Sequence, residues 1–598
     1  MFILGISCYF HDAASVLMSD GQLIAAAEEE RFSRIKHDYS FPRNAIQFCL
    51  EQGGIRSSDL SYVAFFEKPF RKLDRILMTT LQTYPRSCGV FRDSMISWIT
   101  DKLWISTTLN SELGIPKDRV LFSEHHLSHA ASAYLCSPFD EAAILTVDGV
   151  GEWVTATYGV GRGNQISLLK QIEFPHSLGL LYSAFTAFLG FEVNEGEYKV
   201  MGMAPYGQPR YLDKVWKLVE PNSDGSFSLD LDYFSFHHST KQTYSRKFIE
   251  LFGDPRPPSM LFFTEQSGFP SHFGTLPGNY TELCRLNQHY ADIAASIQKV
   301  TEELLLNMAN HLHRETRLKR LCLAGGVALN SVANTRLLNE TPFEELYVQP
   351  SAGDGGGALG AALWAYHSVL GKPREFVMDH SYWGRCYTSA EIRGFLNESN
   401  IIFQEFKDDE ALFDQVVDRL IDGKVVGWFQ GRFEWGPRAL GNRSILADPR
   451  NPEMKNIVNA KIKFREPYRP FAPSVLAEQT ESYFELSNAA KHFPARYMLY
   501  VVPVKQDQRT ALPAITHVDG TARLQMVFRD QSPRYHRLIE RFWQSSGVPV
   551  VLNTSFNLRG EPIVTSPADA LNTFAKSEMD TLVLEDLMVD KAGYAGIH

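Results

Sequence analysis

Two stretches of the chain share one pattern of apolar and polar positions. Residues 2–8 form a short apolar, β-prone run, and AASVLM and QLIAAAEEE follow it on either side of a Ser-Asp-Gly turn. From Ala142, AAILTVDGVGEWVTATYGVGRGNQISLLKQIEF again predicts three strands separated by an Asp-Gly loop and a Gly-rich turn. The two β-meanders begin about 140 residues apart, and helical patterns follow each of them. This repetition predicts a duplicated α/β domain.

Further elements follow from the same periodicities. Helices are predicted at 41–53, 93–113 and 287–316, and a short strand at 116–122 leads into the Ala-rich HHLSHAASAYL, which favours helix. RLCLAGGVALNSVAN predicts a strand, a turn at Gly325 and Gly326, and the start of a helix. A strand at 345–348 precedes SAGDGGGALG, which is typical of a loop that opens a helix. The nucleotide of such a duplicated domain is expected in the cleft between its halves.

The stretch 208–280 breaks this regularity. It is rich in Pro, Asp, Ser and Phe, as in DLDYFSFHHST and RPPSMLFF. An irregular segment of this length is either a functional lid or a poorly ordered excursion, and a lid over the cleft is favoured.

A domain boundary is predicted after the helix that ends near His367. We place the first domain at 1–370, a linker at 371–384 and the second domain at 385–598, whose first amphipathic helix has Ser389 as its expected N-cap.

Composition narrows the class of protein. A chain of 598 residues implies several domains, and 44% hydrophobic with 21% charged residues is ordinary globular composition. The net charge of -10 disfavours nucleic acid as the main partner. Seven Cys without CxxC spacing favour a reducing compartment. With no signal-like start and no apolar run of about 20 residues, a soluble cytoplasmic protein that does not span a membrane is expected.

His125 and His129 stand at i and i+4, so a helix would present both imidazoles on one face. Alone, such a pair is more often a pair of surface residues than a metal site. Asp148 at the end of a strand and Asp354 at a helix start are candidate further ligands for a metal. Asp354 could instead be a helix cap, but the five Gly of GDGGGALG favour a flexible cradle.

Gly-rich turns with charged residues are candidate nucleotide contacts, because glycine lets the backbone approach phosphate. Any single Gly turn is better explained by a plain hairpin. In NEGEYKVMGMAPYG, Glu197 and Lys199 are expected in a tight turn, where they would touch a ribose or phosphate or lie in a solvated loop.

The second domain carries a concentration of cations in an acidic protein. Basic side chains interleave with Trp428, Trp435, Phe464 and Phe471, which favours a binding site for a small polyanion over a solvated basic surface. They are Arg432, Arg438, Arg443, Lys463, Arg465 and Arg469. Asn553, Ser555 and Asn557 follow a strand and add short polar groups.

The ordered set of motifs resembles the NodU/TobZ family of O-carbamoyltransferases over essentially the whole chain. It comprises HDAAS, HxxxH, VDGVGE, GEYKVMGMAPYG, LAGGVALN, GDGGGALG, GPRALGNRSIL, YRPFAPSV and LNTSFN. The resemblance implies a Kae1-like domain of the actin-like ATPase (ASKHA) fold followed by an α/β YrdC-like domain. The variable stretch 208–280 would lie on the acceptor side.

For the YrdC-like domain the resemblance implies synthesis of carbamoyl adenylate from carbamoyl phosphate and ATP with Mg²⁺. The implied binding residues are Arg432, Arg438, Arg443, Lys463, Arg469, Arg523, Asn553 and Ser555.

For the Kae1-like domain it implies a divalent metal, iron(II), on His125, His129, Asp148 and Asp354. The implied nucleotide contacts are Gly149, Glu197, Lys199, Gly325, Gly326, Asn330 and Gly353. His11 corresponds to the catalytic base, although it could be a turn residue, and Lys36 to a second polar group on the acceptor side. The acceptor would be a hydroxylated small molecule, and the oligomeric state stays open.

Two other classes share parts of these folds. A tRNA threonylcarbamoyl transferase is disfavoured by the acidic charge and the lack of a basic stripe. An actin-like ATPase acting as a sugar kinase or chaperone is disfavoured by the histidine pair, because magnesium prefers carboxylates and water.

Overall fold

The computed structural model describes residues 1–100, 102–270, 273–463, 465–466 and 468–594. The chain forms two compact units. The first comprises 1–29, 37–266 and 277–378, and the second comprises 30–36, 267–276 and 379–598. The stretch 371–384, expected as a linker, is therefore divided between the units, and two short segments of the first 370 residues fold with the second unit.

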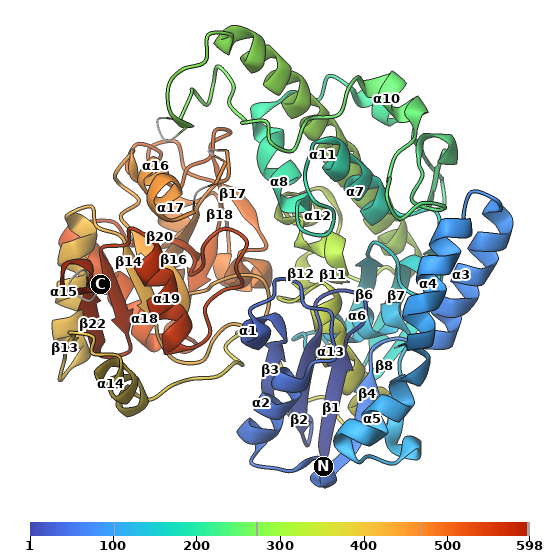
Figure 1. The fold of residues 1–598 in the computed structure, drawn as a ribbon, viewed down its shortest axis with the longest axis horizontal. Coiled ribbons are helices and arrows are strands. Elements are labelled where there is room, and N and C mark those ends of the chain that lie inside the picture. Colours follow the sequence, from blue (N-terminus) through green and yellow to red (C-terminus); the bar gives the residue numbers. More distant parts are fainter. Residues whose placement is uncertain (101, 271–272, 464, 467, 595–598) are drawn as a thin grey trace. The chain divides into compact units, whose positions relative to one another are not determined.

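The first unit contains two five-stranded sheets with the same topology (Figure 1). In one sheet the order is β3 (Gln22–Glu28), β2 (Ala14–Ser19), β1 (Phe2–Ser7), β4 (Leu60–Phe65) and β5 (Val120–Phe122). In the other it is β8 (Gln165–Glu173), β7 (Val154–Arg162), β6 (Glu141–Val147), β11 (Arg320–Ala324) and β12 (Glu345–Val348). In the first sheet, β1 pairs antiparallel with β2 and parallel with β4. In the second, β6 likewise pairs antiparallel with β7 and parallel with β11. The predicted duplication is confirmed, and its architecture is the actin-like ATPase fold.

Two helices pack between these sheets. α6 (His125–Tyr134) packs on β6 and β11, whereas α13 (Asp354–Leu363) packs on β1 and β2. Glycines permit α13 to lie close to α6 and to β1. A Cβ on Gly360 of α13 would lie 1.8 Å from the carbonyl oxygen of Ser128 on α6, and a Cβ on Gly5 of β1 would lie 2.0 Å from the carbonyl oxygen of Ala358 on α13. The glycines after Asp354 are helical and closely packed, so the expected flexible cradle is wrong there.

Most other predicted helices are present with shifted bounds. α2 is Arg43–Gly53, and the long helix is α11 (Tyr280–Thr316). The helix expected at 93–113 is instead α4 (Cys88–Thr100) and α5 (Ile105–Leu113), with a short 3-10 turn at Lys102–Trp104 before α5. α3 (Pro69–Thr83) precedes them, and α12 (Ser331–Glu340) follows the Gly325 turn. The turn expected around Glu197 is wrong, because α8 (Glu197–Met203) occupies it.

The variable stretch is better packed than its composition suggests. It contains α9 (Leu212–Val215), β9 (Val219–Pro221), β10 (Phe227–Leu229) and α10 (Arg246–Phe252). Phe248 and Phe252 are buried, and their rings lie 5.0 and 5.2 Å from that of Phe185 on α7 (Leu178–Phe188). Aromatic contacts at these distances hold α10 as part of the core, so this portion is not a loose lid.

The second unit is built on one mixed eight-stranded sheet (Figure 1). Its order is β13 (Gln404–Glu405), β22 (Leu587–Asp590), β21 (Thr581–Leu584), β14 (Val426–Phe429), β15 (Arg443–Ala447), β20 (Val550–Ser555), β16 (Ala472–Leu476) and β19 (Gln525–Val527). α15 (Asp409–Ile421) and α18 (Pro533–Ser546) contribute to its core.

The N-cap expected at Ser389 is wrong. α14 (Ser389–Glu398) is capped by Thr388, whose side chain accepts from the Glu391 N–H while Glu391 bonds back to Thr388. Within the described part of the chain, no helix combines the length and the apolar character needed to cross a membrane.

Replacing Gly360 by Ala is expected to lower the free energy of unfolding of the first unit by at least about 1–3 kcal/mol, because the new methyl group must displace the backbone of α6. Urea denaturation followed by circular dichroism measures the change. Gly394→Ala in α14 is the matched control: nothing lies within 4 Å of the added Cβ, so a gain of up to about 1 kcal/mol is expected. Equal stability of the two variants would contradict the close packing.

Candidate functional site

The structure brings all four expected metal ligands together in the first unit. His125 begins α6, His129 lies one turn later, Asp148 follows β6 and Asp354 begins α13. The two Nε2 atoms are 3.1 Å apart. His125 Nε2 is 3.2 Å from an Asp148 oxygen, and His129 Nε2 is 3.6 Å from an Asp354 oxygen. One ligand atom from each residue lies within 4.8 Å of the others.

Neighbouring loops fix these side chains. Glu152 accepts hydrogen bonds from the backbone N–H of His125 (3.0 Å) and of Lys68 (2.8 Å), so it satisfies the first turn of α6. A Cβ on Gly151 would lie 2.8 Å from the His125 ring, which explains a glycine before Glu152. The Gly326 N–H donates to Asp148 (2.8 Å), and Gly325 has a φ of 95° against Val147. These two glycines, expected as nucleotide contacts, position Asp148.

The cluster fits a divalent metal ion. All four residues are buried, and one Asp354 oxygen has no hydrogen-bond partner within the described residues. Four ligand atoms about 2.1 Å from a central ion would lie roughly 3.4 Å from one another, close to the observed separations. Two imidazoles with two carboxylates suit several transition metals, so the donor set does not select iron.

Electrostatics support this fit. Burial alone lowers the pKa of His129, but hydrogen bonds and charges of Asp148 and Asp354 outweigh it and raise that pKa to about 9. Burial opposes ionisation of Asp148, yet the two imidazoles hold its pKa well below its usual range. The pocket is thus built for positive charge next to two carboxylates.

A second group surrounds the expected base. His11 Nδ1 lies 2.8 Å from one oxygen of Asp12, and His37 Nδ1 lies 2.7 Å from the other. Asp12 and His37 have φ values of 44° and 55°, a region that residues other than glycine seldom adopt. Burial lowers the pKa of His11, but the hydrogen bond and charge of Asp12 outweigh it and raise that pKa to about 9.

Sequence reasoning missed Asp12 and His37 as members of this group. Asp12 directly follows His11 in the sequence, but no periodicity shows that His37 returns to the same carboxylate. Lys36 belongs to segment 30–36 of the second unit. Its role on the acceptor side stays a prediction.

The other expected nucleotide contacts have structural partners. Glu197 accepts from the Ser183 hydroxyl (2.8 Å) and the Asn194 N–H (3.0 Å), and Lys199 lies over the Phe191 ring. The Asn330 side chain caps α12 through the Ala333 N–H. Gly149 and Gly353 border open space. Their nucleotide contacts stay predictions.

In the second unit, several of the expected cations gather. Burial, followed by the charges of Arg438, Arg465 and Arg469, holds the pKa of Arg523 well below its usual range. Burial with Arg465 and Arg469 has the same effect on the pKa of Lys463. Lys463 also donates to Asn557 (2.9 Å), whose side chain bonds Ser555. Like charges held this close favour an anion as their partner.

Three predicted anion-binding residues bond within the protein, and their contacts with an anion stay predictions. Buried Arg443 donates to the carbonyls of Gln430 and Asn442. Arg432 donates to those of Trp383 and Gly384, and the Asn553 amide bonds Ser474 and Gln525. The structure therefore gives these three a part in shaping loops and strands. Phe464, expected among the basic residues, lies outside the described residues.

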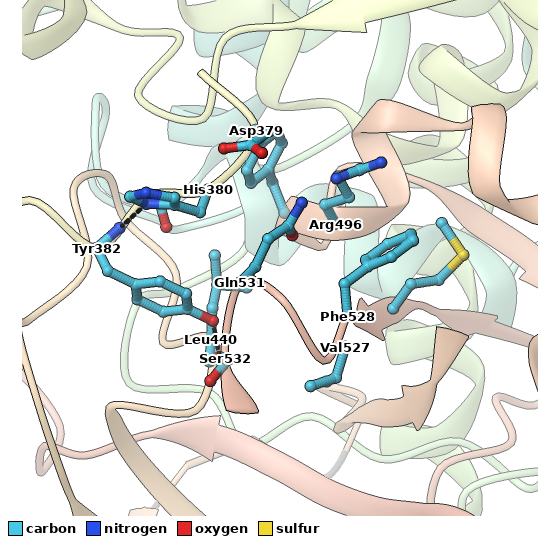
Figure 2. A pocket seen from close by; sticks show the side chains of 12 residues that line it. Asp379, His380, Tyr382, Leu440, Arg496, Val527, Phe528, Gln531 and Ser532 are labelled. Atoms are coloured by element: carbon cyan, nitrogen blue, oxygen red, sulfur yellow. Dashed lines mark hydrogen bonds between the residues drawn. The ribbon is translucent and has the colours of Figure 1, made fainter. Parts of the chain in front are cut away.

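A separate pocket of the second unit is too small for substrate. Figure 2 shows His380, Tyr382, Phe528 and Ser532 around it. Its volume of about 10 Å³ is no larger than one water molecule requires.

Metal analysis tests the first site. The purified chain is expected to hold about one divalent transition-metal ion, and His129→Ala is expected to lose most of it. Mass spectrometric metal analysis and thermal unfolding with and without chelator measure both effects. His313→Ala on α11 is the control and should retain the metal. A His129→Ala protein with full metal content would contradict the assignment.

Comparison with known proteins identifies two family models that match this chain. Residues 2–363 match the family model for the carbamoyltransferase N-terminus, and 417–591 match that for the carbamoyltransferase C-terminus. An uncharacterized Synechocystis protein is 46% identical, covering 98% of this chain and 96% of its own. Nodulation protein NolNO of Sinorhizobium fredii is 39% identical over 98% of this chain and 79% of its own. The 3'-hydroxymethylcephem-O-carbamoyltransferase of Amycolatopsis lactamdurans is 33% identical over 79% of this chain and 80% of its own. The chain belongs to the carbamoyltransferase family.

Proposed function

We propose that this carbamoyltransferase makes carbamoyl adenylate in its second unit and transfers the carbamoyl group to a hydroxyl of a small molecule in its first unit. The observation that carries the proposal is the buried cluster of His125, His129, Asp148 and Asp354. The same unit also contains His11, which is hydrogen-bonded to Asp12. The relatives named as O-carbamoyltransferases support oxygen as the accepting atom. Seven free cysteines favour a reducing, cytoplasmic setting.

The activation step belongs to the second unit, which we propose is YrdC-like. Water hydrolyses carbamoyl phosphate to carbamate and phosphate; a carbamate oxygen then attacks the α-phosphorus of ATP, and pyrophosphate leaves as its bond to that phosphorus breaks. Arg438, Lys463, Arg469 and Arg523 would hold the triphosphate, with Mg²⁺ on ATP. Their positive charge would offset the negative charge that develops on the phosphoryl oxygens.

The transfer step belongs to the first unit. His11 would take the proton from the acceptor hydroxyl as its oxygen attacks the carbamoyl carbon, and AMP leaves as the C–O bond to phosphate breaks. Asp12 would fix the ring of His11 through its Nδ1, which leaves Nε2 for the hydroxyl. A divalent metal, proposed to be iron(II), would supply Lewis-acid binding of the nucleotide phosphate on His125, His129, Asp148 and Asp354.

Nucleotide contacts of the first unit complete the proposal. Gly149 and Gly353 have room for a phosphate near the cluster, because nothing lies within 4 Å of a Cβ built on either. Glu197, Lys199 and Asn330 would approach the adenosine. Gly325 and Gly326 would take part through the position they give Asp148.

Pyrophosphate release tests the activation step. With carbamoyl phosphate and ATP, Arg523→Ala is expected to lower the rate by about 100-fold or more, because a positive charge that would face the phosphates is lost. Arg393→Ala is the control, since its exposed ion pair with Glu405 lies on the surface of the same unit. Unchanged pyrophosphate release by Arg523→Ala would refute this assignment.

The pH dependence of transfer tests the base. Because Asp12 raises the pKa of His11 to about 9, the neutral base becomes more abundant as the pH rises towards that value. In Asp12→Asn this stabilisation of the imidazolium is removed. The rising limb of the pH–rate profile for acceptor carbamoylation should therefore move to lower pH, with a lower plateau from the less well oriented ring. If the rising limb did not move, Asp12 would not set the pKa of the catalytic base.

A further inference from the structure

The helical hairpin of α3 and α4 carries a concentration of exposed apolar side chains. The two helices pack against each other, and Figure 1 shows them at the edge of the first unit. Of the 20 large hydrophobic residues that are exposed in the described part of the chain, seven lie within the 32 residues 69–100 of this 598-residue protein. We call these seven the apolar hairpin surface: Phe70, Leu77, Met78, Leu81, Tyr84, Phe91 and Ile96.

α3 has the reverse of the usual amphipathic arrangement. A helix on the surface of a globular protein normally turns its apolar stripe inward and its charged residues outward. On α3, Phe70 is 71% exposed and Leu81 is 72% exposed, whereas Lys72 is 2% exposed. The Lys72 ammonium group lies 2.7 Å from the carboxylate of Glu67, which is also buried. This orientation leaves apolar area in water, which is unfavourable in proportion to that area.

Contacts on the inner face hold α3 in this orientation. Arg75 donates to the carbonyl of Gly151 (2.8 Å), and the next residue, Glu152, accepts from the Lys68 N–H just before the helix (2.8 Å). Rotating α3 to bury its leucines would break these bonds and separate the buried ion pair, and removing one partner of such a pair costs about 3–5 kcal/mol. The apolar hairpin surface is therefore left to be covered from outside the unit.

This surface has the size of one side of a protein interface. A whole aromatic side chain presents about 150–250 Å² and an aliphatic one somewhat less, so the exposed fractions of the seven residues amount to roughly 700–900 Å². The largest apolar patch of a typical monomer covers about 300–600 Å². A standard interface takes about 800 Å² from each partner. Two copies of this surface thus supply the area that a stable dimer needs.

The charges of the hairpin favour a second protein over a lipid surface. Helices that bind lipid surfaces carry several Lys or Arg residues that meet anionic headgroups. Here exposed Arg71 is paired with Glu124 (2.9 Å). Exposed Arg92 is paired with Asp93 (3.0 Å), so Arg86 is the one exposed cation of the described hairpin with no carboxylate within 4.0 Å. Interfaces between identical subunits are more apolar and poorer in charge than other interfaces, as this surface is.

We propose that the apolar hairpin surface is a homodimer interface, in which the hairpins of two copies of this chain pack against each other about a twofold axis. A twofold axis brings the same patch of both copies together, so each apolar side chain meets an equally apolar partner surface. The four helices would then bury their outer sides as the helices of a bundle do. This association does not rest on the proposed carbamoyl transfer.

Sedimentation velocity of the full chain, with no substrate added, tests the proposal. A species of twice the 67.7 kDa chain mass is expected at about 10 µM and above, with dissociation on dilution, because a dimer of separate chains obeys mass action. Amide hydrogen exchange in peptides from α3 and α4 should become faster on the same dilution. A chain that stays monomeric at about 50 µM would overturn the proposal.

Variants locate the interface. The double variant Leu77→Lys with Leu81→Lys is expected to raise the dissociation constant at least about 100-fold, because four ammonium groups would enter one apolar contact. Ile402→Lys is the matched control: Ile402 is 71% exposed in the second unit, and the dimer should persist. Circular dichroism with thermal unfolding verifies that each variant is folded, and the exchange measurement on the unmodified chain needs no variant.

Three outcomes would contradict this assignment. The first is a dimer that the double variant leaves intact, and the second is hydrogen exchange in α3 and α4 that does not depend on concentration. The third is a monomer that floats with vesicles of phosphatidylcholine and phosphatidylserine, which would identify a lipid surface as the occupant instead. Each of these results is independent of pyrophosphate release and acceptor carbamoylation, so failure here is distinct from failure of the proposed function.

Discussion

The site of the first unit depends on the close contact between α6 and α13. One helix supplies both histidines and the other supplies Asp354, and each is packed on a different sheet. Their backbones approach because Gly360 has no side chain where it faces the Ser128 carbonyl. Packed interiors leave no room for even one extra methyl group at such a point. The separation of the metal-binding side chains is therefore set by backbone contact.

Glycine has two distinct uses in this chain. At Gly325 a positive φ is needed for the tight turn after β11, and the next N–H then reaches Asp148. At Gly151 and Gly360 the requirement is space, for the His125 ring and for α6. Motifs that resemble phosphate-binding loops thus serve largely to aim carboxylates and imidazoles, and a nucleotide would meet a surface that these contacts have already fixed.

The two units place charge in opposite ways. In the first, histidines and carboxylates are buried together, so each stabilises the ionised form of the other. In the second, buried Lys463 and half-buried Arg523 lie near other cations, which disfavours their charged forms. Such an arrangement is unfavourable without an anion. The first unit is therefore suited to a cation and the second to phosphate groups, as the division of labour in the proposed reaction requires.

The sequence by itself determined the duplicated α/β fold, most strands and helices, the HxxxH pair and the two aspartates, because periodicity and strand ends are local properties. It also indicated the basic character of the second unit. It could not decide that Arg443 would be bonded to carbonyls while Arg523 faced other cations, since both are simply Arg beside β-prone residues. Nor could it join His37 to Asp12. Those relations connect residues far apart in the chain, and only the packing of sheets and helices brings them within hydrogen-bond distance.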